Sequence, residues 1–215
     1  MYFDLNDNID DLTRPRLFDR EPCVSWMLKH VSGTLWDVGC NIGQFAVPAS
    51  LLAGNKVVAF DISPRSCRLL AKTAHFNKLP VVIVNQALST VSFSYAVPAS
   101  SRPTEDTGGC DLGSIQQVAM TFMDAARLYG VPALVKMDIE GGEKLFLESS
   151  AWKQWIVENG VYWIFELHSF KGAETLIWDD VPSLQMDETH YLCHANREEM
   201  NKLALAWRQV PIPHG

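Results

Sequence analysis

Short apolar runs alternate with stretches of helical periodicity along most of this chain. The candidate strands cover residues 34–38, 56–60, 81–84, 134–138 and 161–166. Parallel strands need a long crossover between them, and a helix usually supplies it. A run as continuously apolar as 56–60 is typical of a parallel strand that is buried on both faces. The alternation therefore predicts an α/β fold, a doubly wound, mostly parallel sheet with helices on both faces.

The stretches between the apolar runs have the periodicity and end signals of helices. Ser63 and Pro64 predict a helix start, because the serine hydroxyl can accept from free backbone amides and proline loses no hydrogen bond there. Further helices are expected around residues 23–31, after Gly43 to about residue 53, and as one helix of about fifteen residues from Gly142.

The chain of 215 residues, 47% hydrophobic and 20% charged, indicates one domain over residues 1–215. We expect an acidic tail and a helix over 1–30, a core over 33–170 and a C-terminal extension over 171–215. Residues 89–113 are rich in Ser, Pro, Thr and Gly, which predicts an exposed loop or a hairpin excursion. A substrate lid is the alternative for this segment.

The charge and cysteine patterns limit which partners we expect the protein to bind and which cell compartment we expect it to occupy. Eighteen Lys and Arg against 25 Asp and Glu give a net charge of −7, which repels phosphate backbones and argues against nucleic acid. No apolar run approaches the roughly 20 residues that cross a bilayer, and the acidic first residues are unlike a leader peptide. Five scattered cysteines fit reduced thiols. We expect a cytoplasmic protein that contacts no membrane. Both a monomer and a homo-oligomer are compatible with the sequence.

The loop from Asp37 to Gly43 is the most informative segment. It reads D-x-G-x-N-x-G, in which Gly39 lets the backbone approach a ligand and Gly43 lets the next helix pack closely. Dinucleotide folds use G-x-G-x-x-G, and Asn41 replaces their second glycine. Asp37 would repel a pyrophosphate but suits a ligand with an ammonium or sulfonium group, and S-adenosylmethionine carries both. A plain tight turn is the alternative.

Two other strand ends supply groups for the same ligand. Asp61 follows the second predicted strand, at close to the spacing at which an acid accepts both ribose hydroxyls. After the third strand, Gln86 can reach an adenine amino group and the small Ala87 leaves room for the ring. A solvated aspartate and a simple turn are the alternatives at these two places.

Several segments resemble the FkbM family of S-adenosylmethionine-dependent methyltransferases. They are LWDVGCNIGQFAV (35–47), VVAFDISP (57–64), VNQALS (84–89), LVKMDIEGGEKLFLE (134–148) and IFELH (164–168). The resemblance implies a class I methyltransferase fold, which is Rossmann-like, with S-adenosylmethionine as cofactor and S-adenosylhomocysteine as its product. It also implies methylation of a hydroxyl on a small molecule or saccharide. Asp61 followed by Ile62 departs from the family's usual Glu-Pro.

A second polar cluster is predicted at the ends of the fourth and fifth strands. Lys136, Asp138 and Glu140 alternate along one strand and would face one way, and charges in mid-sheet are costly to bury. We therefore expect them at the rim, beside Glu166 and His168 of the neighbouring strand. Asp138 or His168 is expected to take the proton of the acceptor hydroxyl, with Glu140 or Glu166 orienting it.

Three alternatives accompany this interpretation. Asp138, Glu140, Glu166 and His168 could together hold Mg²⁺ against a substrate diol, although a metal is not favoured. A nicotinamide-dependent oxidoreductase on a similar sheet is the second, and a degenerate cofactor-binding module that serves as an interaction domain is the third. Apart from these, the cluster could be a structural network in which Lys136 pairs with a carboxylate and Glu143 is an acid in the first turn of a helix, where it suits the dipole. For Glu143 this structural interpretation is preferred.

Overall fold

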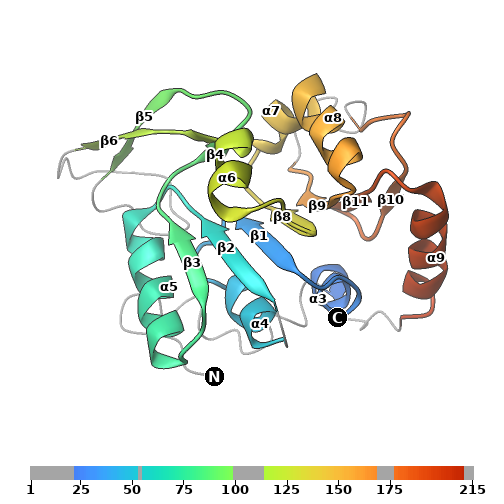
Figure 1. Cartoon of the computed structure of the whole chain (residues 1–215), viewed down its shortest axis with the longest axis horizontal. Coiled ribbons are helices and arrows are strands. Elements are labelled where there is room, and N and C mark those ends of the chain that lie inside the picture. The colour runs from blue at the N-terminus through green and yellow to red at the C-terminus, as the bar shows by residue number, and fades with distance from the viewer. Residues whose placement is uncertain (1–21, 53–54, 99–113, 169–176, 211–215) are drawn as a thin grey trace.

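The computed structural model describes residues 22–52, 55–98, 114–168 and 177–210 (Figure 1). Its centre is a seven-stranded sheet in the order β10-β11-β9-β8-β1-β2-β3. The strands are β1 (Thr34–Val38), β2 (Lys56–Phe60), β3 (Val81–Val84), β8 (Leu134–Met137), β9 (Tyr162–Glu166), β10 (Ser183–Gln185) and β11 (His190–Cys193). All neighbours from β3 to β9 are parallel, and only the β9–β11 and β11–β10 pairs are antiparallel. The predicted doubly wound, mostly parallel sheet is confirmed.

Helices cover both faces of this sheet (Figure 1). One face carries α3 (Pro22–His30), α4 (Ala46–Leu51), α5 (Pro64–Phe76) and α9 (Arg197–Trp207), and the other carries α6 (Phe122–Tyr129), α7 (Glu143–Leu147) and α8 (Ser150–Asn159). Side chains alternate between the two faces along each strand. Leu35 therefore packs in the apolar core on the α3 face, and Trp36 packs in the core on the α6 face. Within the described ranges, every helix falls short of the length and apolarity that a bilayer-crossing segment requires.

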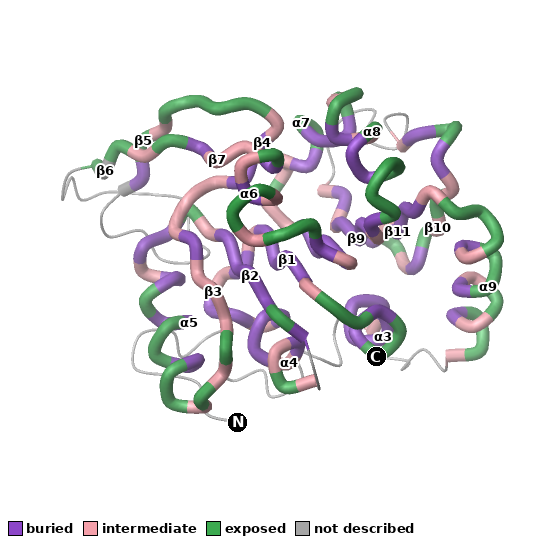
Figure 2. Tube along the Cα trace, in the orientation of Figure 1, coloured by how far each residue is buried: buried purple, intermediate pink, exposed green. Residues whose placement is uncertain are grey.

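The central strands are buried along nearly their whole length (Figure 2). Burial of both faces explains why these strands are visible in the sequence as continuous apolar runs rather than as alternating patterns. The polar residues that function needs are consequently confined to the strand ends and to the loops that follow them.

Two predicted helix boundaries can be compared directly with the structure. Ser63 caps α5 as expected, because its Oγ accepts from the backbone amide of Ser66 at 3.2 Å. The single helix predicted from Gly142 is wrong, since α7 ends at Leu147 and α8 starts anew at Ser150. Ser149 separates them in an extended conformation and caps α8 by accepting from Trp152 N at 3.2 Å.

The segment that interrupts the strand–helix alternation contains a small ribbon. β5 (Ser94–Pro98) pairs antiparallel with β6 (Ser114–Val118), while β4 (Leu88–Ser89) pairs parallel with β7 (Met120–Thr121). Figure 1 shows the β5–β6 ribbon beyond the end of β3, beside β4. Residues 99–113 of the predicted excursion lie outside the described residues, as do 1–21 of the predicted acidic tail.

Candidate functional site

A cavity of about 360 Å³ lies at the carboxyl ends of the parallel strands. Its wall includes Asp37, Gly39 and Asn41 of the first loop, together with Asp61, Gln86, Ala87, Asp138 and Glu140. A volume of this size is typical of small-molecule and cofactor pockets. In open α/β sheets ligands bind in such a crevice at the strand ends. Gly43, Glu166 and His168 are absent from the cavity wall and lie in the elements behind or beside it.

The glycines of the first loop are required by their neighbours. Gly39 has φ +79°, and a Cβ at this position would lie 1.7 Å from the backbone oxygen of Asp138. Gly43 has φ +94°, and a Cβ there would lie 2.3 Å from Leu70 of α5 and 3.2 Å from Val47 of α4. Gly39 therefore lets the β1 loop meet the end of β8, and Gly43 lets two helices pack against the loop.

Asp37 and Lys136 form a buried ion pair on adjacent strands. Asp37 is fully buried, its Oδ1 lies 4.0 Å from Lys136 Nζ, and the two residues are register partners of β1 and β8. Lys136 Nζ also lies 3.4 Å from Asp138 Oδ2. Lys136 lines the cavity near the end of β8, and its side chain is only 8% exposed. Burial is tolerated because two carboxylates face the ammonium group.

Asp61 is held by the backbone of two loops. Its Oδ2 accepts from Asn41 N and its Oδ1 from Ser63 N, both at 2.7 Å. Asn41 adopts φ +48°, the left-handed conformation that aims its amide at this carboxylate. Burial raises the pKa of Asp61, although the two amide hydrogen bonds act in the opposite direction. Each carboxylate oxygen keeps lone-pair capacity for a ligand hydroxyl.

A chain of hydrogen bonds connects the β5–β6 ribbon to Asp61. The amide of Ala87 donates to Tyr95 Oη at 2.7 Å, and Tyr95 Oη donates to Gln117 Oε1 at 2.7 Å. Gln117 Nε2 donates to Asn85 Oδ1 at 3.2 Å, and Asn85 Nδ2 donates to the backbone oxygen of Asp61 at 2.9 Å. Sequence reasoning missed Tyr95, because the residues it joins lie far apart in the chain.

Gln86 and Phe93 complete this end of the cavity. Both line its wall, and Gln86 Nε2 donates to the backbone oxygen of Val118 at 3.0 Å. An adenine amino group would need a hydrogen-bond acceptor, and the amide oxygen of Gln86 is the acceptor end of that side chain. Phe93 is 41% exposed and was also missed, since an aromatic residue in a polar loop carries no distinguishing signal.

A polar cluster beside the part of the cavity wall that Asp138 and Glu140 form is centred on His168. Its Nε2 lies 3.2 Å from Glu140 Oε2 and 3.7 Å from Asp138 Oδ1. Asp138, Glu166 and His168 each bring a ligand atom within 4.8 Å of the other two, so these three are the side chains here that could hold a metal ion. The structure thus brings together the ionisable groups that the sequence placed on two separate strands.

Glu143 is the member of this cluster that sequence reasoning undervalued. Its carboxylate is fully buried, accepts from Ile139 N at 2.6 Å and from Gly141 N at 2.9 Å, and lies 3.5 Å from His168 Nδ1. It does open α7, as expected for an acid in a first helical turn. The signal available was the Glu-Gly-Gly sequence before it, because a turn there folds the chain back over the carboxylate.

Glu140 departs from its expected conformation. β8 ends at Met137, and Glu140 adopts φ +53° in the turn that Glu143 holds, with its side chain 86% exposed. The expectation that Lys136, Asp138 and Glu140 continue one strand is therefore wrong for Glu140. From this turn the Glu140 carboxylate still comes within 3.2 Å of His168 Nε2.

Fold and site together define a Rossmann-like α/β protein with a crevice at the carboxyl ends of its strands, beside a cluster of acid and base groups. The family profile of the methyltransferase FkbM domain matches residues 37–202. The chain therefore belongs to the FkbM methyltransferase family. Its resemblance to that family is confirmed, and with it the class I methyltransferase fold.

Individual relatives are more distant. The ribosomal protein L11 methyltransferase of Pelotomaculum thermopropionicum is 42% identical over 57 residues, which is 26% of this chain and only 18% of that protein. A Salinibacter ruber RNA methyltransferase crystallised with S-adenosyl-L-homocysteine is 12% identical, with a TM-score of 0.46 over 81% of this chain and 89% of that one. The ribosomal protein L11 methylase of Lactobacillus delbrueckii subsp. bulgaricus is 14% identical, with a TM-score of 0.49 over 81% and 76%.

Proposed function

We propose that this protein transfers the methyl group of S-adenosylmethionine to a hydroxyl group of a small molecule or saccharide. The observation that supports this most is that the two ends of one cavity carry different functional groups. A backbone-held carboxylate, Asp61, lies toward one end, and the wall at the other end includes Asp138, which lies 3.7 Å from His168. A nucleoside would occupy the first end, and the second would receive the acceptor.

The residues present fit the cofactor. Asp61 would accept the ribose hydroxyls, Gln86 and Ala87 would border the adenine, and Gly39 would border the cofactor along the first loop. Asp37, paired with Lys136, would face the amino-acid portion together with Asn41. When bound, S-adenosylmethionine supplies a methyl group already activated on a sulfonium centre.

The protein's task is then to align the acceptor and remove its proton. The acceptor oxygen must stand opposite the sulfur, so that its bond to the methyl carbon forms as the carbon–sulfur bond breaks. Asp138 or His168 Nε2 would accept the hydroxyl proton. Glu140 and Glu166 would orient the base, and we add Glu143, which faces His168 Nδ1 at 3.5 Å.

The charge of the cluster bears on the class of acceptor. Asp138, Glu140, Glu143 and Glu166 gather around His168, with Lys136 engaged by Asp138 and Asp37. A phosphate-rich acceptor would meet this negative field at close range. We therefore propose a neutral hydroxyl compound as acceptor and no nucleic acid.

Calorimetry with S-adenosylhomocysteine tests the cofactor part of the proposal. We expect Asp61→Ala to weaken binding at least tenfold, because the ribose loses its acceptor, and the exposed Asp179→Ala control to leave it unchanged. Equal affinity for wild type and Asp61→Ala would remove the ribose assignment. Binding of NADH in preference to S-adenosylhomocysteine would favour the oxidoreductase alternative.

Turnover assays test the chemical part. Release of S-adenosylhomocysteine is measured with a panel of sugars, polyols and phenols. Asp138→Asn is expected to keep cofactor affinity and lose most of the turnover, because the amide cannot take a proton. Unchanged turnover would overturn the role of Asp138, and cofactor binding without turnover on any acceptor would favour a binding module.

A further inference from the structure

A second set of metal-binding side chains lies outside the cavity, where α3 meets the turn between β10 and β11. Cys23 belongs to the first turn of α3, Asp187 to the turn between the strands, and His190 to the first position of β11. Each offers one ligand atom, and these atoms lie within 4.8 Å of one another. None of the three lines the cavity described above.

The three side chains are already arranged around a common point. Cys23 Sγ donates to Asp187 Oδ2 at 3.2 Å, and His190 Nδ1 lies 2.9 Å from Asp187 Oδ1. The turn fixes the carboxylate, because Asp187 Oδ1 also accepts from the backbone amides of Thr189 and His190 at 3.0 and 2.8 Å. Ligand distances of about 2.0 to 2.3 Å place donors roughly 3.3 to 3.7 Å apart around a tetrahedral ion. The two separations from Asp187, 3.2 and 2.9 Å, lie within about half an ångström of that range.

The donor types and their burial select the metal. A thiolate, an imidazole and a carboxylate form the borderline-soft set that zinc prefers, whereas Mg²⁺ and Ca²⁺ require mostly oxygen ligands. Cys23 is fully buried, and the side chains of His190 and Asp187 are 8% and 32% exposed. The partly open carboxylate leaves a route for an ion to enter.

We propose that Cys23, Asp187 and His190 form a zinc site that joins α3 to the β10–β11 hairpin. Zinc replaces the thiol proton of Cys23, which leaves to solvent, and binds the neutral ring of His190 through Nδ1 while Nε2 carries the ring proton. Water takes the fourth position of the tetrahedron, since the chain supplies three ligands. This site is independent of the methyl-transfer proposal.

The location of the site gives the ion a structural role beside the cavity. The next two residues of α3, Val24 and Ser25, line the cavity. On the hairpin side, Thr189 Oγ1 lies 3.5 Å from Glu166 Oε1. Zinc would therefore fix α3 and the β10–β11 hairpin, which border the cofactor crevice and the acid cluster. The ion would contact neither the cofactor nor the acceptor.

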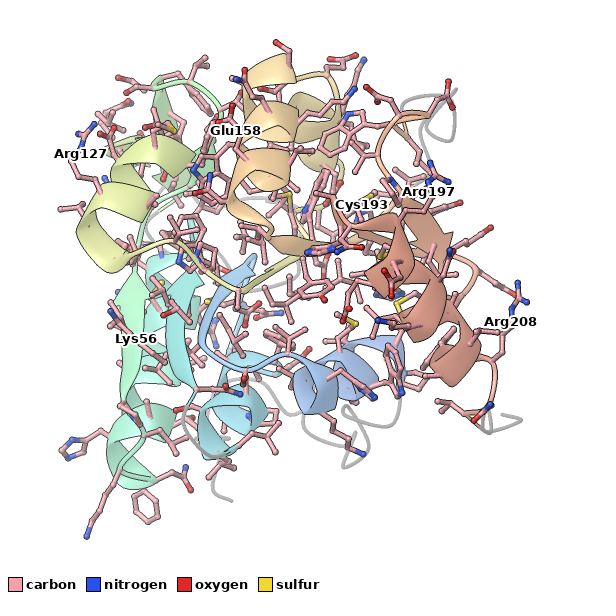
Figure 3. The ribbon with its side chains drawn as sticks, turned by 45° about the vertical axis from the view of Figure 1, so that its right-hand side comes forward. Lys56, Arg127, Glu158, Cys193, Arg197 and Arg208 are labelled. Carbon is pink, nitrogen blue, oxygen red and sulfur yellow. The ribbon has the colours of Figure 1, made fainter. Side chains whose placement is uncertain are left out.

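Cobalt is the direct probe, because a thiolate ligand gives Co²⁺ an intense ultraviolet charge-transfer band. We expect the full-length, metal-stripped wild-type protein to bind one equivalent of Co²⁺ with this band, and Zn²⁺ to displace it. Cys23→Ser should lose the band, and His190→Gln should weaken Co²⁺ binding at least tenfold. Cys193 ends the strand that His190 begins and is labelled in Figure 3. Cys193→Ser and His168→Gln should keep both band and affinity.

Three results would overturn the proposal. They are a wild-type protein without the band in excess Co²⁺, a band that survives in Cys23→Ser, and a loss of binding in His168→Gln instead of His190→Gln. The last result would place the metal at the Asp138 cluster. If Cys23→Ser does not fold, His190→Gln decides, because zinc should raise the melting temperature of the wild type and not of this variant.

Discussion

Glu143 Oε1 lies 3.5 Å from Nδ1 of His168, while the same carboxylate accepts the amides of Ile139 and Gly141. One buried side chain therefore shapes the turn after β8 and faces the imidazole. With Nδ1 directed at Glu143, the other ring nitrogen points to Asp138 and Glu140 at the cavity mouth. We therefore propose that Glu143, a residue outside the cavity wall, helps to orient the proposed base.

The first prediction concerns Glu143→Gln, which keeps the size of the side chain and removes its charge. We expect turnover to fall about ten- to a hundredfold with cofactor affinity nearly unchanged, because the ring loses its orienting carboxylate. Losing one acceptor for a buried amide should also lower the free energy of unfolding by about 1 to 3 kcal/mol. Glu148→Gln, an exposed acid just after α7, is the control. Equal turnover of the two variants would contradict the role of Glu143.

The second prediction compares two glycines that share a left-handed conformation. Gly141 has φ +96° with open space where a Cβ would stand, whereas a Cβ on Gly39 would lie 1.7 Å from Asp138 O. Gly141→Ala should therefore cost only about 1 to 2 kcal/mol of backbone strain. Gly39→Ala should cost about 2 kcal/mol or more beyond that and abolish cofactor binding. Urea unfolding and calorimetry measure both, and similar losses for the two variants would count against the close approach.

The third prediction concerns the buried pair of Lys136 and Asp37. Removing one member of such a pair strongly destabilises a protein, so Lys136→Met should lower the free energy of unfolding by about 3 to 5 kcal/mol. Adding Asp37→Asn should restore part of the loss. Lys144→Met, which breaks a pair exposed by about half on both sides, should cost at most about 1 kcal/mol. Chemical unfolding of the wild type, Lys136→Met, Asp37→Asn, the double variant and Lys144→Met tests this, and purely additive effects of the double variant would refute the coupling.

The fourth prediction concerns pH. Burial raises the pKa of Asp61, despite its amide hydrogen bonds to Ser63 and Asn41. The ionised carboxylate accepts the ribose hydroxyls, so cofactor affinity is complete above this pKa and is lost as the pH falls through it. We expect the loss to begin at a higher pH than the value near 4 of an ordinary aspartate. Calorimetry from neutral to acid pH should show this loss of cofactor affinity in the wild type only. A loss of affinity over the same pH range in Asp61→Asn would assign the titration to another group.

The central strands could be predicted because burial on both faces leaves a continuous apolar run in the sequence. β10 and β11 could not be predicted, since three or four residues at a sheet edge carry too little pattern. The two-helix structure of residues 143–159 was missed because apolar spacing continues across Ser149, which breaks the helix by capping the next one. A local capping signal competed there with a periodicity that spans it.

The site divides in the same way. Asp61, Asp138 and His168 follow predicted strands, so their arrival at one edge follows from parallel strand topology. The pairing of Lys136 with Asp37 depends on strand register, which apolar runs do not specify. Tyr95 and Glu143 act through contacts made by folding of the surrounding loops, and residue type alone does not distinguish them from ordinary surface or helix residues.

The attachment of the β5–β6 ribbon has an evolutionary consequence. Tyr95 and Gln117 tie the ribbon to Ala87 and Asn85 at its end nearest β3, while the connection between the two strands leaves from the far end. Substitutions at the exposed pair Ala96 and Gln116, farther along the ribbon, leave these contacts in place and should not displace the crevice. The sequence of the described ribbon can therefore vary at that pair while the crevice keeps its shape.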